Sequence, residues 1–558
     1  TKPDHSPAEN TMVIITMNLP ENKKCHRGLF PVACSAAATA MLLLSSYSYG
    51  QVMRPLAQSR DEPPPVTEGG WRFRPQMTLL ETYTDNVTFT RGDLQKSDFI
   101  TQLNPGISVI GLGRRFNVNI DYTMNNLIYA NNSNFTRTRQ QLNARGTVEL
   151  LEDFFFVDGR AMNSQQNATL FGPQAVDNVN VTGNRVNILA LNVSPYIRHR
   201  FQNFATTELR YTHNTVNSSS NALSNSQGDS FQGGLNSGTA FSTLNWGLNY
   251  SHQMVHFDNS NRTVELERSI ANLRYMVTNQ FGLTASGGYE RNSFISIRGS
   301  PSSPTWTVGF SWIPSERTSI VASVGQRFFG PTYSLLASHR TRLTIWNASY
   351  DQNITTFNQQ AGLGSSATLG GSLGQLLAAQ NPTASPDFIQ QSSNALTGLG
   401  LSGSYFSPTN FLTNQLFLQK VLQASVTMNG ASNTVVLRVF DMTRQAWSSA
   451  SVDASLVNGV NPALLNHTRQ SGANALWSYR ISELTRANLN LAFTRFSYLS
   501  VGRVDDLKLI SLSMTRQLWQ AQPSLNGMIQ VRHQERSSNQ AGGAYSENAI
   551  IASLNMSF

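Results

Sequence analysis

Residues 116–123 read Phe116-Asn117-Val118-Asn119-Ile120-Asp121-Tyr122-Thr123, an unbroken alternation of apolar and polar side chains. Successive side chains of a β-strand point to opposite faces, so this segment would present one apolar face and one polar face. A helix would instead place its apolar residues three and four positions apart. The segment therefore predicts a strand that separates water from an apolar phase.

The same alternation recurs along the chain after Trp71, most clearly at Leu142–Leu150, Thr305–Trp312 and Leu525–Arg532. We count about 20 such windows of roughly 10–14 residues, separated by Asn, Ser and Gly clusters. Soluble sandwiches use strands of about 5–6 residues, whereas a tilted strand crosses a bilayer in about 9–11. We therefore predict an all-β fold, a transmembrane antiparallel up-and-down β-barrel of about 18–20 strands, because bacterial barrels use even numbers.

The C-terminus carries a sharper local signal. In residues 550–558, Ile550, Ala552, Leu554, Met556 and Phe558 alternate with Ile551, Ser553, Asn555 and Ser557. A final strand that ends in Phe resembles the signal that the barrel-assembly machinery reads in outer-membrane barrels. Leu554, Met556 and Phe558 are therefore the candidate assembly signal.

The composition excludes several classes of protein. Hydrophobic residues make up 40% and charged residues 13% of the 558 positions, against about 45–50% and about 25% in soluble domains. An aromatic share of 9% argues against disorder. Only six lysines are present, which disfavours a large helical enzyme with Glu–Lys pairs on its helices. We expect no nucleic-acid partner, and the net charge of +9 rests mainly on arginine.

The first 50 residues predict a secretory signal peptide. A basic stretch at residues 23–27 precedes the apolar run Leu29–Leu44, and Ser48-Tyr49-Gly50 offers small residues before Gln51. A transmembrane anchor is disfavoured because the run is shorter than the usual span of about 20 residues. We expect translation to start at Met17.

This leader would contain both cysteines of the chain, Cys25 and Cys34, so the mature protein would have no thiol and no disulfide. Residues 51–70, with Pro63-Pro64-Pro65, are interpreted as a periplasmic spacer, and residues 71–558 as the barrel. The expected location is the outer membrane of a Gram-negative bacterium, among its lipids and lipopolysaccharide.

One segment interrupts the alternation. Residues 357–410 contain no Lys or Arg and a single acid, Asp387. A connection this long is either functional, as a plug, lid or cap, or a disordered insertion. Both interpretations stay open.

Four short segments resemble a specific family. They are Glu81–Val87, Asn104-Pro105-Gly106, Trp312–Thr318 and Arg327–Gly330. Together they resemble the outer-membrane barrel proteins associated with the PEP-CTERM/exosortase system, over about residues 75–558. The resemblance implies a barrel encoded beside exopolysaccharide synthesis and export functions, and it implies no catalytic residue.

The polar faces of the predicted strands supply candidate lumen-facing residues. Arginine pairs with carboxylates and phosphates through a planar fork and stays charged. Three readings stay open for these side chains: bracing of the lumen, contact with an anionic substrate, and contact with lipid phosphate. The candidates are Arg145 with Glu149, Glu208 with Arg210, and Gln530 with Arg532.

Patterns typical of catalysis are weak. The nucleophile-elbow match at residues 370–374 and the glycine fingerprint at 398–403 lack the flanking strand and helix that such sites need. His252 and His256 fall on a predicted strand, Leu244–Phe257, where four residues span about 13 Å, too far for one metal ion. We predict no catalytic, cofactor-binding or metal-binding residue and no enzyme activity.

Aromatic residues near strand ends are expected to form interfacial girdles. The residues assigned to these girdles are Tyr129, Trp246, Trp312, Trp346 and Trp477.

The leading functional hypothesis is a conduit, or a component of an export complex, for exopolysaccharide. Its partners would be the barrel-assembly machinery, periplasmic export components and an anionic polysaccharide. The alternative is a non-transporting barrel that docks surface-sorting machinery, and the third reading is an outer-membrane hydrolase.

Overall fold

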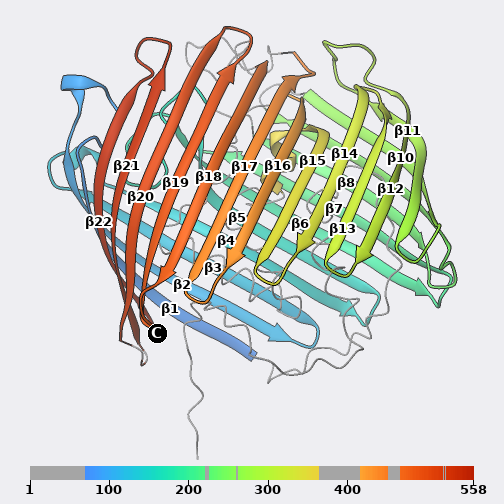
Figure 1. Cartoon of the computed structure of the whole chain (residues 1–558), viewed down its shortest axis with the longest axis horizontal. Helices are drawn as coiled ribbons and strands as arrows, with labels where there is room; N and C mark the ends of the chain where they lie inside the picture. The colour runs from blue at the N-terminus through green and yellow to red at the C-terminus, as the bar shows by residue number, and fades with distance from the viewer. Residues whose placement is uncertain are drawn as a thin grey trace, which may run out of the picture.

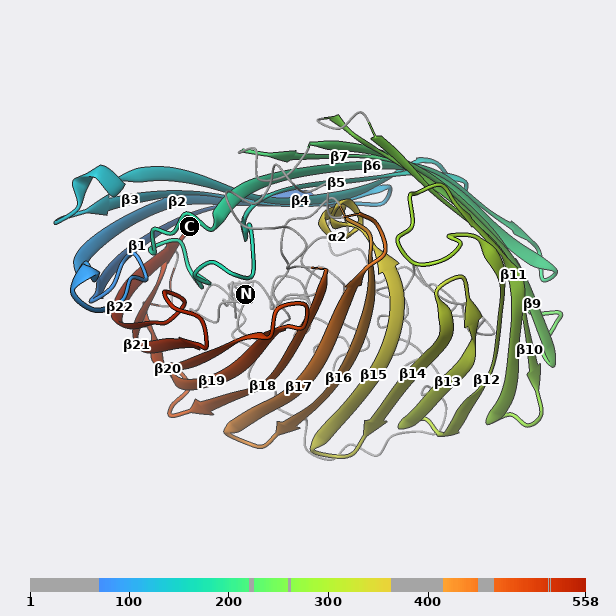
Figure 2. The same cartoon turned by 90° about the horizontal axis from the view of Figure 1, so that it is seen from above.

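The computed structural model describes residues 70–219, 225–258, 262–362, 415–449, 466–519, 521 and 523–558. The predicted signal peptide and residues 51–69 of the spacer lie outside this part of the chain. The described residues form 22 antiparallel strands arranged in one ring (Figures 1 and 2). None of their helices is long and apolar enough to cross a membrane.

The strands follow one another around the ring in chain order. Their bounds are β1 Gly70–Thr84, β2 Asp98–Gly113, β3 Phe116–Tyr129, β4 Arg137–Leu151, β5 Phe155–Asn167, β6 Arg185–Phe201, β7 Ala205–Ser218, β8 Ser226–Ser237, β9 Leu244–Phe257, β10 Arg262–Met276, β11 Phe281–Asn292, β12 Ser303–Ser315, β13 Thr318–Arg327, β14 Gly330–Arg340, β15 Thr344–Thr355, β16 Phe417–Asn429, β17 Asn433–Ala446, β18 His467–Arg480, β19 Thr485–Tyr498, β20 Arg503–Trp519, β21 Ser524–Ser538 and β22 Tyr545–Ser557.

The last strand closes the barrel on the first. Leu79 lies opposite Leu554, and Tyr83 lies opposite Ile550. Every other strand pairs with its neighbours in sequence, so the predicted antiparallel up-and-down barrel is confirmed.

The predicted count of 18–20 strands is wrong, because the barrel has 22. The sequence count relied on Asn, Ser and Gly clusters to separate the strands. Several connections contain none of these residues: Arg114-Arg115, Glu316-Arg317 and Phe328-Phe329. Two-residue connections of this kind merge neighbouring strands in a count based on composition.

The outward face of the barrel suits a bilayer. Five tryptophans near the end that holds the first residue of β1 point outward and are 43–60% exposed: Trp71, Trp312, Trp346, Trp477 and Trp519. Outward tyrosines gather toward the opposite end, among them Tyr83, Tyr289 and Tyr333. These two sets form the aromatic girdles that flank the apolar band of a membrane barrel.

The girdle spacing agrees with this assignment. On β1, Trp71 and Tyr83 are separated by about 40 Å along the strand, or about 30 Å along the barrel axis at a tilt of about 40°. Of the residues assigned to girdles from sequence, Trp312, Trp346 and Trp477 point outward. Tyr129 does not: its side chain is buried on the inner face, so that assignment is wrong.

The two ends of the barrel differ in the length of their connections. The end that holds Gly70 and Phe558 has only short turns, of which residues 238–243 form the longest. The opposite end carries the long connections, 85–97, 168–184 and 356–416. Outer-membrane barrels place short turns in the periplasm and long loops outside the cell. The short-turn end is therefore the periplasmic end in an outer membrane.

Candidate functional site: an inward segment on a wall of arginines

The connection between β5 and β6 folds into the barrel and forms what we call the inward segment, residues 168–184. Figure 2 shows it in teal inside the ring. Asn184 closes its base: the side chain accepts a hydrogen bond from Thr169 N (2.8 Å) and donates to Thr169 O (2.8 Å). Gly172 is required here, because a Cβ at this position would lie 2.4 Å from Asn184 Cγ.

Arginines on the barrel wall hold the first half of this segment. Arg536 on β21 donates to Leu170 O (2.9 Å) and to Gly172 O. Arg503 on β20 donates to Phe171 O (3.4 Å). The acceptors are backbone carbonyls, so this half is bound through its main chain.

Two strands on the other side of the segment hold its second half. Arg137 on β4 donates to Asn178 O (3.1 Å) and Asn180 O (3.2 Å), and Arg185 at the start of β6 donates to Asp177 O. We call the set Arg137, Arg185, Arg503, Arg532 and Arg536 the arginine cradle.

Arg532 on β21 makes the charged contact with the segment, an ion pair with the carboxylate of Asp177. Burial raises the pKa of Asp177, but Arg532 first, and Arg185 with it, lower it more, so the pKa lies below its ordinary value. The carboxylate is therefore held in its charged form, which keeps the ion pair intact.

The wall also contributes carboxylates to the arginine cradle. Glu547 on β22 is fully buried and accepts two hydrogen bonds of 3.0 Å from Arg532. Asp505 on β20 accepts from Arg536 (2.6 Å) and Arg503 (3.0 Å). The arginine cradle thus holds five arginines, of which Arg503, Arg532 and Arg536 pair with the two wall carboxylates, and Asp177 of the inward segment supplies a third carboxylate.

Apolar contacts accompany these polar ones. Val179 packs in a cluster with Val87, Ile100 and Leu127, and Leu170 packs with Phe417, Phe496 and Tyr498. Phe171 stacks on Tyr498 with ring centroids 4.3 Å apart. The inward segment is a well-packed element, although it forms no regular strand or helix.

A second part of the chain enters the lumen after β15. The helix α2, Phe357–Gly362, lies inside the ring against β6 and β7 (Figure 2). A capping box starts it: Gln359 N donates to Thr356 Oγ1 (3.1 Å), and Thr356 N donates to Gln359 Oε1 (2.9 Å). The long insertion expected at residues 357–410 therefore begins with a docked helix, while residues 363–414 lie outside the described part.

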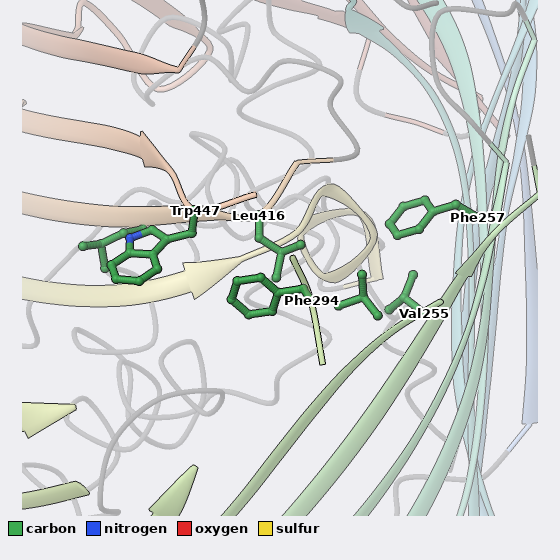
Figure 3. Close-up of a cluster of buried hydrophobic side chains, with 7 residues drawn as sticks. Val255, Phe257, Phe294, Leu416 and Trp447 are labelled. Atoms are coloured by element: carbon green, nitrogen blue, oxygen red, sulfur yellow. The ribbon is translucent and has the colours of Figure 1, made fainter. Parts of the chain in front are cut away.

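Contacts from α2 reach the wall opposite β15. Asn358 accepts from Asn214 Nδ2 on β7 (2.9 Å) and donates to Ser226 Oγ on β8 (2.9 Å). Phe357 packs with Val186, Ile188 and Val216. Figure 3 shows a second apolar cluster beside the helix, in which Val255 and Phe257 of β9 approach Phe294, Leu416 and Trp447. Together these contacts join opposite walls of the ring.

The structure places the six candidate lumen-facing residues on β4, β7 and β21. On β21, Gln530 and Arg532 are 3% and 2% exposed, whereas the adjacent Val531 is 53% exposed. On β7, Arg210 forms ion pairs with Asp158 (2.6 Å) and Glu208 (3.1 Å). This contact is a brace between wall side chains.

The β4 candidates are placed less centrally. Arg145 and Glu149 alternate with Val148 and Leu150, both of which are exposed on the outward face. Glu149 accepts a hydrogen bond from the backbone amide of Asp153 in the adjoining turn. It therefore serves the turn between β4 and β5.

Sequence reasoning missed the inward segment and four of the cradle residues. The available signal was weak: residues 168–184 lack alternation and contain Gly172-Pro173, which is typical of any loop. Their partners on β21 and β22 lie more than 350 positions away, so no local pattern connects them.

The fold adds no support to the sequence patterns that are typical of catalysis. His252 and His256 lie on β9, whose predicted bounds Leu244–Phe257 match the structure. No group of three metal-binding side chains occurs within the part of the chain that the structure covers. The glycine motifs at 370–374 and 398–403 lie outside the described residues.

The candidate assembly signal lies at the end of the closing strand. Leu554 and Phe558 are exposed on the outward face, and Phe558 N donates to Pro75 O of β1 (3.0 Å). Recognition of Leu554, Met556 and Phe558 by the assembly machinery stays a prediction.

Solved structures of outer-membrane barrels share this architecture. The siderophore receptor PirA from Pseudomonas aeruginosa is 11% identical with a TM-score of 0.45, over 88% of this chain and 81% of that chain. The siderophore receptor PiuA from Acinetobacter baumannii is 8% identical with a TM-score of 0.44, over 87% and 82%. The outer membrane protein OpdK from Pseudomonas aeruginosa is 8% identical with a TM-score of 0.33, over 87% and 99%.

No protein-family model and no curated protein matches the sequence. At 8–11% identity, the likeness to the solved structures concerns the barrel fold alone.

Proposed function

We propose that this chain is an outer-membrane conduit whose lumen is gated by the inward segment. The observation that carries the proposal is the way this segment is held. Its polar anchors include hydrogen bonds and one ion pair from wall arginines to loop atoms, which can exchange for water or ligand without breaking the strand pairing of the barrel. Opening would also separate the apolar contacts of Leu170, Phe171 and Val179 with the wall.

The proposed cargo is exopolysaccharide. The resemblance to the PEP-CTERM/exosortase-associated barrels supports this choice. The inner face of the neighbouring strands carries amides and hydroxyls that are buried in this structure, a polar lining that suits a hydrated polymer once the lumen opens: Asn474, Asn488, Asn490, Ser511, Ser513 and Gln530. On this proposal the chain is exported by its signal peptide and inserted by the barrel-assembly machinery.

The test is single-channel conductance of the refolded barrel with the inward segment replaced. The replacement is feasible because Asn167 lies opposite Arg185 and Ala168 N donates to Asn184 O (2.8 Å), so an Asn-Gly turn can substitute for residues 169–183. We expect the intact chain to show rare channel openings. The chain in which Asn-Gly replaces residues 169–183 should show a steady open-channel conductance. A folded, bilayer-inserted replacement that stays silent contradicts a gate at this segment.

A matched control keeps the loop surgery outside the proposed gate. Removing residues 92–95, which belong to the exposed part of the connection 85–97 at the same end of the barrel, leaves the arginine cradle and the contact of Val87 with Val179 in place, so it should not raise conductance. Deleting residues 363–414 tests the other long insertion separately.

The second candidate is a docking barrel that transports nothing. The specific observation in its favour is the pair of apolar clusters that tie α2 and Leu416 to the β6–β9 wall, because such contacts suit a permanent filling of the lumen. Conductance that remains absent after both replacements, with surface protein sorting lost in a deletion strain, would favour this role.

A further inference from the structure

We propose that the arginine cradle is a binding site for an acidic, carboxylate-bearing glycan, and that the inward segment occupies this site as an internal stand-in. The inference deepens the conduit function proposed above and rests on it for the route of the glycan. The binding itself is a property of named wall residues and can be measured without transport.

The first support is the chemistry of the present contacts. Asp177 places a carboxylate on Arg532, and the other hydrogen bonds of the cradle to the segment go to backbone carbonyls. Arginine binds carboxylates in a forked geometry, with hydrogen bonds that are stronger than those to neutral carbonyls. A polymer with a carboxylate on each sugar would therefore replace several neutral acceptors with charged ones.

The second support is the charge balance of the wall. The described carboxylates that the cradle contacts are Glu547 and Asp505, so displacement of Asp177 leaves five arginines facing two acids. An uncovered cradle would attract polyanions and disfavour neutral polymers. The same imbalance explains why the segment carries an acid at residue 177, where it lies against Arg532.

The third support is the aromatic surface under the segment. Phe171 stacks on Tyr498 at an interplanar angle of 16°, and Arg503 lies over both rings, 5.2 Å and 5.4 Å from their centroids. A sugar ring has a flat apolar face of similar size, so it could take the place of Phe171. The cradle would then combine a stacking platform with adjacent guanidinium groups.

The experiment measures binding of two fluorescent oligosaccharides of equal length to the full chain in detergent. The acidic probe is oligogalacturonate and the neutral probe is a malto-oligosaccharide. We expect the chain with residues 169–183 replaced by Asn-Gly to bind the acidic probe at least tenfold more tightly than the intact chain does. The neutral probe should bind weakly to both.

Point variants assign the binding to the cradle. In the replaced chain, Arg137→Gln and Arg536→Gln should each weaken acidic-probe binding at least fivefold and reduce its salt dependence. Arg469→Gln is the matched control, because Arg469 pairs with Asp441 on the outward face (2.6 Å) and should leave binding unchanged. In the otherwise intact chain, Asp177→Asn should increase acidic-probe binding, because it weakens the stand-in and leaves every wall arginine in place.

The outcomes separate this proposal from the conduit. Equal binding of acidic and neutral probes, or binding that is insensitive to Arg137→Gln and Arg536→Gln in a folded barrel, overturns the glycan site. Selective acidic binding by a replaced chain that conducts no current supports the site and counts against the conduit.

Discussion

At the scale of single residues, burial decides which ion pairs contribute most to the free energy of unfolding. Glu547 is fully buried and accepts hydrogen bonds from Arg532, from Thr84 Oγ1 (2.9 Å) and from Asn180 Nδ2 (2.8 Å). We predict that Glu547→Gln lowers the free energy of unfolding by about 2–3 kcal/mol, because Arg532 loses a buried charged acceptor while its ion pair with Asp177 remains. Urea unfolding followed by tryptophan fluorescence in lipid vesicles measures this loss.

The matched control is Glu535→Gln on the neighbouring strand β21. Glu535 pairs with Lys508 at 3.2 Å, and both side chains are about half exposed on the outward face. Its removal should cost no more than about 1 kcal/mol. Equal losses for the two variants would show that the Arg532–Glu547 pair is not the stronger structural contact.

Residue-level prediction from sequence reached the faces of the strands but not the partners. Alternation placed Arg532 and Gln530 opposite Val531, and the buried and exposed fractions follow that division. Asp177, the partner of Arg532 in the inward segment, is 355 positions away in sequence and lies in a loop without periodicity. Such contacts depend on ring closure, which no local window contains.

At the scale of elements, the inward segment should respond to acid. Its Asp177 faces Arg532, Arg185, Arg137 and the Tyr129 hydroxyl, and its pKa in place lies below the ordinary value of 3.8. Because the pKa of Asp177 is lowered while the inward segment lies on the arginine cradle, the Asp177 carboxylate stabilises this position of the segment above about pH 3.8. That stabilisation is lost as the pH falls through the lowered pKa. We predict unchanged conductance of the intact chain between pH 7 and pH 5 and a rise below about pH 3.8.

The Asp177→Asn variant isolates this carboxylate from Glu547 and Asp505. It should conduct more than the intact chain at pH 7 and show a smaller acid-induced rise. An identical acid response in the variant would assign the effect to other groups.

Element-level prediction from sequence succeeded where periodicity was strong. The bounds of β9 were obtained directly, and the last strand was recognised from its alternation. The inward position of residues 168–184 was not predicted, because a connection of this length is typical of a surface loop. The insertion at 357–410 was recognised by composition, but the capping box at Thr356 and Gln359 that starts α2 was overlooked.

At the scale of the whole molecule, an even strand number places both ends of the barrel on one side. Gly70 and Phe558 lie at the end with short turns, and the tryptophan girdle lies at that same end. Sequence alone left open which connections share an end, because the individual strand bounds were not fixed. The structure sorts the short and the long connections to opposite ends, and this sorting assigns the short-turn end to the periplasm.

Cysteine labelling tests the orientation in intact cells. Both cysteines of the sequence, Cys25 and Cys34, fall in the predicted leader, so a single introduced thiol would be the reporter. Asp93→Cys lies in the exposed residues 91–97 of the connection 85–97, and Arg342→Cys lies in the exposed turn 341–343 at the other end. We predict that a membrane-impermeant maleimide labels Asp93→Cys in whole cells and labels Arg342→Cys only after the outer membrane is permeabilised. The opposite labelling pattern would show that the barrel has the inverse orientation. The inward segment and the arginine cradle would then lie toward the periplasm and would be the first part of the barrel to meet an exported polymer.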